Sequence, residues 1–165
     1  MKTIIAKSVT GKETQVNVSD LVLAISQYAV IINGGRVLIS PQWKENGYDF
    51  PGGHLNLGED NLDGLVREVK EETGFVVRPL NVLGVYTSFF MHPRKNKAQQ
   101  SINIYYSAEI VSGEISTDGL DTDELGYAKE ARFVTLAELK SMELMHTSQE
   151  PLKVIIPYLE ERLRR

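Results

Sequence analysis

The hydrophobic and polar residues of this chain follow two different periodicities, one typical of β-strands and one typical of α-helices. Residues 22–32 (VLAISQYAVII) and 36–40 (RVLIS) flank a glycine-rich turn at 33–35, a pattern that is typical of a β-hairpin. Residues 76–90 and 101–110 are two further runs, rich in the β-branched and aromatic residues that strands favour. We expect these runs to join in one mixed β-sheet.

Another stretch, of about residues 61 to 73, has helical spacing. It follows a good N-cap residue at Asp60 or Asn61 and stops before Gly74, a typical helix terminator. Its apolar residues form a single stripe that predicts a helix face against a core: Leu62, Leu65, Val66 and Val69.

Two more helices are expected near the end of the chain. Thr135 and Glu138 have the spacing of a capping box, which predicts a helix over roughly 136 to 145. Residues 151–165 also show helical spacing of apolar positions, with Pro157 as an interior irregularity. This order of elements predicts an α/β sandwich in a single domain over residues 1–165. Residues 1–20 match no pattern beyond that of an added strand.

Composition narrows the class of protein. With 165 residues, 42% of them hydrophobic, the chain can build one domain with a proper core. The absence of cysteine excludes disulfides, thiolate catalysis and thiolate metal sites. No stretch resembles a signal peptide or approaches the ~20 apolar residues of a membrane span. We therefore expect a cytoplasmic protein without membrane contacts, and the sequence leaves the assembly open between a monomer and a homodimer.

Charge is concentrated on one side of the helix predicted at 61–73. At about 100° per residue, Glu68, Glu71 and Glu72 share a face that is distinct from the apolar stripe. Like charges at this spacing repel by about 0.2–0.5 kcal/mol per pair, and the last turn of a helix disfavours anions by roughly 0.3–1 kcal/mol. Local rules that are broken together indicate a functional site. Carboxylate oxygens favour a hard cation, so we expect Mg²⁺, with Mn²⁺ as the alternative.

Two other residues of this helix bear on the site. Gly64 costs up to about 1 kcal/mol relative to alanine inside a helix, and it lies one turn before Glu68, where a missing side chain would leave room for a substrate. Arg67 projects about 100° away from Glu68, too far round the helix to be a metal ligand itself. We expect Arg67 to hold Glu59 or another carboxylate in a bidentate ion pair.

The segment from Gly53 to Phe75 has the pattern G-x5-E-x7-R-E-V-x-E-E-x-G-F. This pattern resembles the Nudix box, and every fixed position of the box is filled. The resemblance implies a Nudix-type α/β/α sandwich with a mixed β-sheet and a loop-helix-loop metal site at 53–75. It also implies hydrolysis of nucleoside diphosphates linked to another group, with a bound divalent metal.

The resemblance assigns roles within the box. Glu68 and Glu72 become metal ligands, Glu71 becomes a third ligand or acts through water, and the backbone carbonyl near Gly53 joins them. Members of the family commonly recruit one more acidic residue from the loop before the last strand. Glu124 is our choice for this ligand or general base, and the same loop offers three others: Asp121, Asp123 and Glu130.

Substrate recognition lies outside the box. Aromatic residues just before it are candidates for stacking on a base, with core packing as the alternative: Trp43, Tyr48 and Phe50. A basic cluster could clamp phosphates, although it suits a solubilising hairpin tip equally well: Arg94, Lys95 and Lys97.

Two functional hypotheses follow. The first is Mg²⁺-dependent hydrolysis of the diphosphate linkage in a nucleoside triphosphate or a nucleoside diphosphate derivative. The second is a catalytically silent Nudix-fold module that binds a nucleotide. The complete set of box glutamates favours hydrolysis. The net charge of −4 argues against binding of nucleic acid by charge neutralisation, so the expected partner is a small nucleotide.

Overall fold

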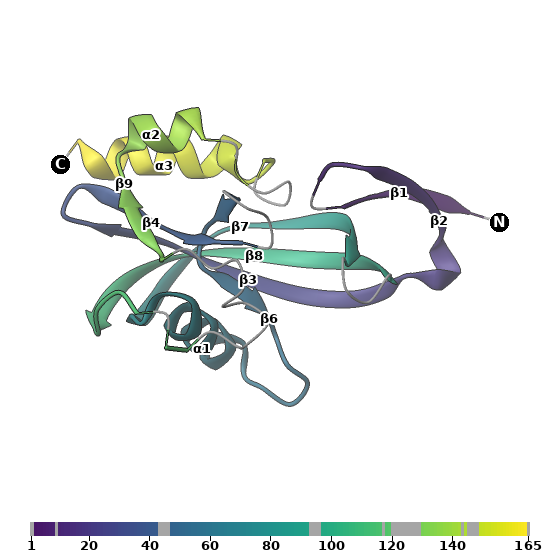
Figure 1. The fold of residues 1–165 in the computed structure, drawn as a ribbon, viewed down its shortest axis with the longest axis horizontal. Helices are drawn as coiled ribbons and strands as arrows, with labels where there is room; N and C mark the ends of the chain where they lie inside the picture. Colours follow the sequence, from purple (N-terminus) through teal and green to yellow (C-terminus); the bar gives the residue numbers. More distant parts are fainter. Residues whose placement is uncertain are drawn as a thin grey trace.

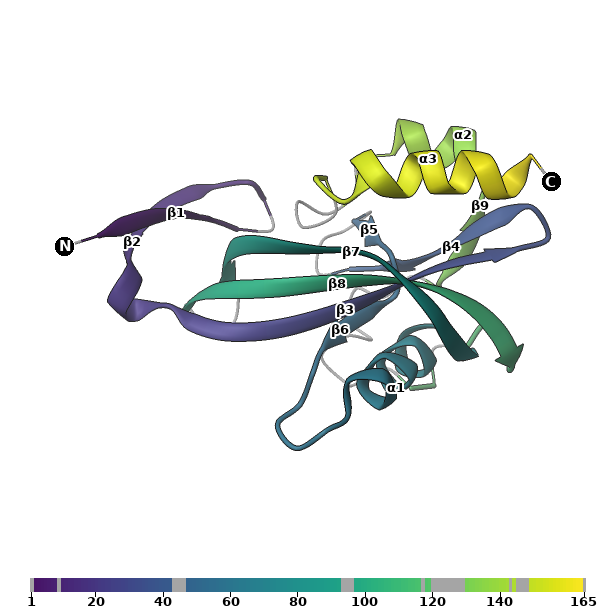
Figure 2. The same ribbon diagram turned by 180° about the vertical axis from the view of Figure 1, so that it is seen from behind.

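The computed structural model describes residues 2–8, 10–42, 47–92, 97–116, 118–119, 130–142, 144 and 149–164. A twisted sheet crosses the molecule, with α1 on one face and α2 and α3 on the other (Figures 1 and 2). The elements are β1 (Thr3–Lys7), β2 (Glu13–Asn17), a 3-10 turn (Val18–Asp20), β3 (Val22–Asn33), β4 (Arg36–Pro41), β5 (Tyr48–Asp49), β6 (Gly52–His54), α1 (Asn61–Thr73), β7 (Val76–His92), β8 (Lys97–Ser112), β9 (Arg132–Val134), α2 (Leu136–Ser141) and α3 (Leu152–Leu163).

The sheet is mixed, as predicted. Its strands lie in the order β2-β1-β7-β8-β3-β4-β5, while β6 pairs with β3 and β9 pairs with β4. The β3–β8 and β1–β7 pairs are parallel, and the other pairs are antiparallel. The β3–β4 hairpin closes through Gly34 and Gly35, whose φ angles of 55° and 75° suit glycine.

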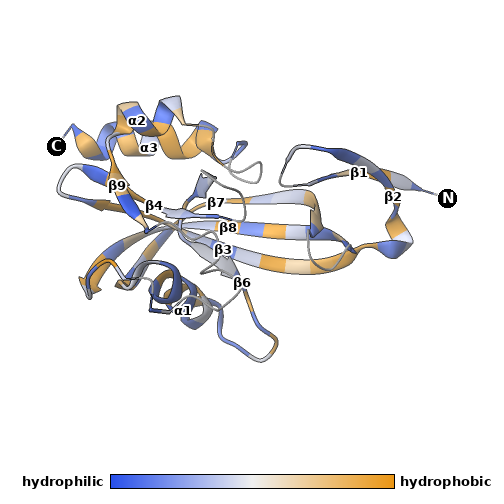
Figure 3. Ribbon diagram, viewed as in Figure 1, coloured by the Kyte–Doolittle hydropathy of each residue, from blue (hydrophilic) through white to orange (hydrophobic). Residues whose placement is uncertain are grey.

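Alternation along the strands divides the core into two layers. Ala29 and Ile31 of β3 face α1, where Leu65 and Val69 pack on them, whereas Val30 faces the opposite side. The layer on the opposite side contains residues of the two C-terminal helices: Leu139, Ile155 and Leu159. Figure 3 shows the hydrophobic residues of α3 and the hydrophilic outer side of α1. This α/β/α arrangement confirms the expected fold class.

The predicted bounds of α1 are confirmed. The Asp60 side chain accepts a hydrogen bond from the backbone N–H of Leu62, and Gly74 ends the helix in the left-handed conformation, with φ at 80°. The predicted stripe is wrong at Leu62, which is 44% exposed. The apolar layer under α1 begins only at Leu65, so the first turn has no core to cover it.

Two other predictions need correction. The capping box of Thr135 and Glu138 is present, but α2 ends at Ser141, because Met142 adopts an extended conformation. Residues 1–20 form two strands, not one: β1 and β2 make a hairpin that lies at the end of the molecule away from the helices (Figure 1). Among the described residues, no helix is long and apolar enough to cross a bilayer.

Candidate active site

The turn before α1 contains glycines because other segments of the protein pack closely against it. β6 pairs with β3, so that Gly53 lies opposite Gln27. A side chain on Gly52 would collide with the backbone of Gln27, and its φ of 145° favours glycine as well. A side chain on Gly53 would collide with the carboxylate of Glu68. Glycine at this position therefore lets Glu68 lie against the backbone of the turn.

Arg67 connects the loop to the helix. Its Nε donates to Glu59 Oε1 at 2.7 Å and its Nη2 donates to Glu59 Oε2 at 3.0 Å, which is the expected bidentate ion pair. Its Nη1 donates to both Glu68 Oε1 and Glu71 Oε2 at 2.9 Å. Nη2 also donates to the carbonyl of His54 at 3.2 Å. One guanidinium thus fixes three carboxylates and the turn.

The charges in this network stabilise each other. The hydrogen bond from Arg67, followed by one from the backbone of Asn56, lowers the pKa of Glu59 to about 2. The hydrogen bond to Glu59 in turn raises the pKa of Arg67 above its usual range. Both groups are therefore ionised at every pH at which the protein would work.

Glu72 lies in the last turn of α1 and contacts β4. Ser40 Oγ donates to its Oε2 at 2.7 Å, and the backbone N–H of Gly52 donates to the same oxygen at 3.0 Å. Gln42 Nε2 donates to its Oε1 at 3.0 Å. These contacts hold the carboxylate between α1, the end of β4 and the glycine turn.

Burial raises the pKa of Glu72 to about 8, because removal from water disfavours the charged form. Hydrogen bonds from Ser40, Gly52 and Gln42 lower it, while the negative charge of Glu68 raises it further. The Glu68 and Glu72 carboxylates are thus close enough to repel each other. A cation bound by both would remove that repulsion.

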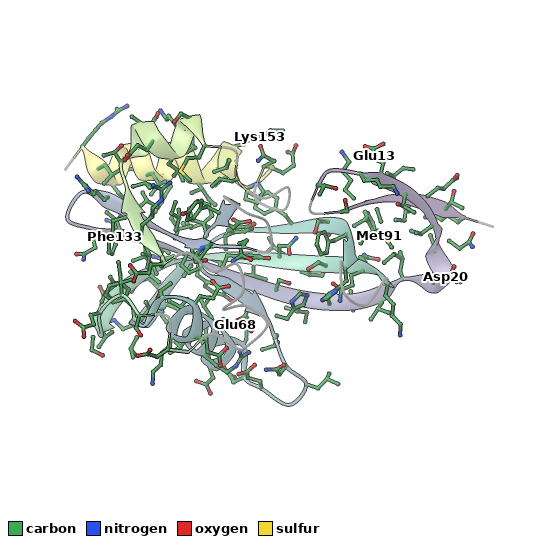
Figure 4. The ribbon with its side chains drawn as sticks, in the orientation of Figure 1. Glu13, Asp20, Glu68, Met91, Phe133 and Lys153 are labelled. Carbon is green, nitrogen blue, oxygen red and sulfur yellow. The ribbon has the colours of Figure 1, made fainter. Side chains whose placement is uncertain are left out.

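The residues present fit a hard cation by their chemistry. Oxygen ligands are available from Glu68, Glu71, Glu72 and the Gly53 backbone, and Figure 4 shows Glu68 on the side of α1 that faces the central strands. Across the described parts of the chain, no group of three or more acidic or histidine side chains is gathered closely enough to hold an ion. The reason is that Arg67 holds Glu68 and Glu71, while β4 holds Glu72. Binding a metal through Glu68 and Glu71 would compete with the hydrogen bonds from Arg67.

The space beside Gly64 is not available to a substrate, contrary to our expectation. A β-carbon on Gly64 would lie 2.8 Å from Leu55 Cδ1 and 3.0 Å from Glu59 Oε2. The loop before α1 therefore fills this space. Gly64 allows the loop to approach the helix and brings Glu59 within reach of Arg67.

The expected stacking on a base is wrong for two of the three aromatic residues. Phe50 is fully buried and Tyr48 is 8% exposed, and both belong to the core layer under α2 and α3. The guanidinium of Arg132 lies 4.7 Å from the centre of the Tyr48 ring. Neither ring offers a free face, because the residues before the box fold inward to close the core. Trp43 lies outside the described residues.

The charged candidates are only partly placed by the structure. Lys97 is exposed at the start of β8, whereas Arg94 and Lys95 lie outside the described residues. Glu124, Asp121 and Asp123 also lie outside them, and Glu130 is exposed just before β9.

The acidic loop that contains Glu124 starts beside the box. A β-carbon on Gly119 would lie 2.7 Å from the Cα of Glu71, so the chain passes directly over the end of α1. Ser116 N–H donates to the carbonyl of Thr73 at 3.1 Å and fixes this crossing.

Sequence reasoning missed Ser40 and Gln42, which hold Glu72. A signal was available for Ser40, a polar residue that directly follows the buried apolar run from Val37 to Ile39. A polar group in such a place needs a hydrogen-bond partner. The partner could not be named without the fold, because Glu72 follows more than 30 residues later in the chain.

The fold and site define an α/β protein in which a glycine turn and a helix with a carboxylate face pack against a mixed sheet. The NUDIX domain family model matches residues 22–156, and the chain belongs to this family.

Individual relatives agree with the family match. The chain is 33% identical over 99 residues to the ADP-ribose pyrophosphatase of Methanocaldococcus jannaschii, a match that covers 60% of this chain and 52% of that protein. It therefore spans about half the length of this relative.

Two solved structures are similar in fold. A NUDIX hydrolase from Nitrosomonas europaea has a TM-score of 0.61 at 24% identity, with coverage of 84% of this chain and 89% of that one. The MutT protein from Methanosarcina mazei Go1 has a TM-score of 0.57 at 25% identity, with coverage of 88% and 96%.

Proposed function

We propose that this protein is a Mg²⁺-dependent Nudix hydrolase, with Mn²⁺ as an alternative metal. Its substrate would be a nucleoside triphosphate or a nucleoside diphosphate derivative, cleaved at the diphosphate linkage. The observation that carries the proposal is the position of Glu68, which lies against the Gly53 turn and close to Glu72. The similarity to an ADP-ribose pyrophosphatase supports the substrate class, since ADP-ribose contains a diphosphate linkage.

The box residues would divide the work as follows. Glu68, Glu72 and the carbonyl of Gly53 would hold the cation, with Glu71 as a further ligand. Arg67 would orient Glu68 and Glu71 through the hydrogen bonds from its Nη1. A bound Mg²⁺ supplies charge neutralisation for the phosphate oxygens and activation of the attacking water.

The proton of the attacking water needs a base. A carboxylate of the box or Glu124 would accept it, and the water oxygen would then form a bond to phosphorus while the bridging P–O bond breaks. Gly119, which lies against the backbone of Glu71 and precedes Glu124 by five residues in the sequence, supports Glu124 as a participant. We also propose that the protein acts in the cytoplasm on a small nucleotide.

A screen for hydrolysis tests this function. Nucleoside triphosphates, ADP-ribose, sugar nucleotides and dinucleotides would be incubated with the protein and Mg²⁺ or Mn²⁺, and products would be identified by mass spectrometry. Glu72→Gln should reduce turnover by about 10²–10³-fold or more, because it removes a charge that holds the metal. Asp63→Asn is the matched control, since Asp63 is an exposed acidic residue in the first turn of the same helix.

The outcomes separate the two hypotheses. Turnover that requires metal and Glu72, but not Asp63, supports the hydrolase. Nucleotide binding without turnover across the whole panel would instead support a catalytically silent binding module.

A further inference from the structure

Two polar residues at the end of β4, Ser40 and Gln42, have no role in the box pattern. Ser40 is fully buried and directly follows the buried apolar residues Leu38 and Ile39. Its hydroxyl donates to Glu72 Oε2 at 2.7 Å, an ordinary distance for a hydroxyl donor. Glu72 therefore supplies the hydrogen-bond partner that the buried hydroxyl needs.

Gln42 completes the contact from the same strand end. Its Nε2 donates to Glu72 Oε1 at 3.0 Å and lies 3.3 Å from Ser40 Oγ. Its backbone N–H donates to the carbonyl of Gly47 at 3.0 Å, which fixes the position from which the side chain reaches Glu72. The two side chains thus hold different oxygens of one carboxylate.

The number of lone pairs limits what Glu72 can still bind. A carboxylate has about four acceptor positions. Oε2 accepts from Ser40 and from the Gly52 N–H, and Oε1 accepts from Gln42. Among the residues that the structure describes, these are the donors to Glu72, so one position on Oε1 stays open for a single bond to a cation.

We propose that Ser40 and Gln42 are positioning residues that orient Glu72 for metal binding through Oε1. This inference rests on the proposed function, because it assumes that Glu72 binds the metal. In the structure, the side chains of Ser40 and Gln42 contact Glu72 and each other. Their loss should lower metal affinity. Mutation of a residue that hydrogen-bonds to a metal ligand typically costs about 10–100-fold in affinity.

The test uses the full chain and Mn²⁺ as the probe. Affinity would be measured by calorimetry and by the electron paramagnetic resonance signal of free Mn²⁺. Ser40→Ala and Gln42→Met should each weaken Mn²⁺ binding by about 10–100-fold. Ser40→Thr, which keeps the hydroxyl, should restore affinity. The Mn²⁺ concentration that gives half-maximal turnover should rise by a similar factor, because the variants lower the occupancy of the metal site.

Ser107→Ala is the matched control. Ser107 is also a buried strand serine, but it bonds with the backbone of Asn81. Its substitution should leave Mn²⁺ affinity unchanged. If Ser40→Ala does not fold, Gln42→Met carries the test, because Gln42 is only partly buried.

Two negative results have different meanings. A wild-type protein that binds no Mn²⁺ would contradict the proposed function itself. If the wild type binds Mn²⁺, and Ser40→Ala and Gln42→Met bind it equally tightly, the positioning role alone is overturned and the hydrolase proposal stands.

Discussion

At the residue scale, the candidate site depends on the shape of one side chain as much as on its charge. The Arg67 guanidinium donates to Glu59, Glu68 and Glu71 at distances of 2.7–3.0 Å. A planar fork with five donors can make these contacts at once, whereas an ammonium group cannot keep the same geometry. Arg67 therefore sets the positions of three carboxylates from the centre of the box.

Arg67→Lys tests this role because it keeps the charge and removes the fork. We expect turnover to fall by about 10²-fold, since displaced catalytic groups cost about that much even when they remain present. Arg78→Lys is the control, because Arg78 is an exposed arginine that forms an ion pair with Glu109. Equal turnover of Arg67→Lys and the wild type, in steady-state kinetics with Mg²⁺, would show that charge alone is sufficient.

The sequence predicted some of these residue contacts and not others. The Arg67–Glu59 pair was predictable, because a fixed spacing within one helix and its loop determines it. The position of Ser40 beside Glu72 was not, because it depends on how β4 packs against α1. The sequence left the burial of Tyr48 and Phe50 open as an alternative to base stacking, since an aromatic residue before the box has the same local sequence whether it faces a substrate or a core.

At the element scale, the reliable predictions rest on local signals. The bounds of α1 follow from Asp60 and Gly74, and the start of α2 follows from Thr135 and Glu138, all of which act within one turn. The end of α2 and the strand pair at 3–17 were missed, although β1 and β2 pair with each other within one short segment of the chain.

The capping box of α2 gives a pH-dependent prediction. Hydrogen bonds from the backbone and side chain of Thr135 lower the pKa of Glu138 below its usual value. A lowered pKa in the folded state stabilises the protein above the unfolded value of about 4.5, and the effect is lost as pH falls through the folded value. Glu138→Gln should therefore lower the melting temperature at pH 7, and by less at pH 3, which lies below the unfolded value.

Thermal unfolding at both pH values measures this difference. Glu114→Gln, at an exposed glutamate after β8, serves as the control. A loss of stability in Glu138→Gln that is the same at pH 7 and pH 3 would show that ionisation of Glu138 plays no part.

At the scale of the whole molecule, the sheet brings together groups that are far apart in the chain. β3 pairs with the strand that contains Gly53, and α1 packs on the face that contains Ala29 and Ile31. Ser40 of β4 and Gln42, just after that strand, contact Glu72. The sequence predicted the α/β/α fold because the box specifies a family with a known layout. It could not specify the substrate, because the box contains the metal chemistry and no contacts to a base or sugar.

The most direct test of the proposed hydrolysis follows the oxygen of the attacking water. ADP-ribose and a nucleoside triphosphate would be incubated with the protein and Mg²⁺ in water labelled with ¹⁸O, and the products would be analysed by mass spectrometry. We predict label in a phosphate group of one product, such as the nucleoside monophosphate, and strongly reduced label incorporation with Glu72→Gln. Label in a sugar or base hydroxyl, or product formation that is independent of Mg²⁺ and Glu72, would contradict attack on phosphorus at this site.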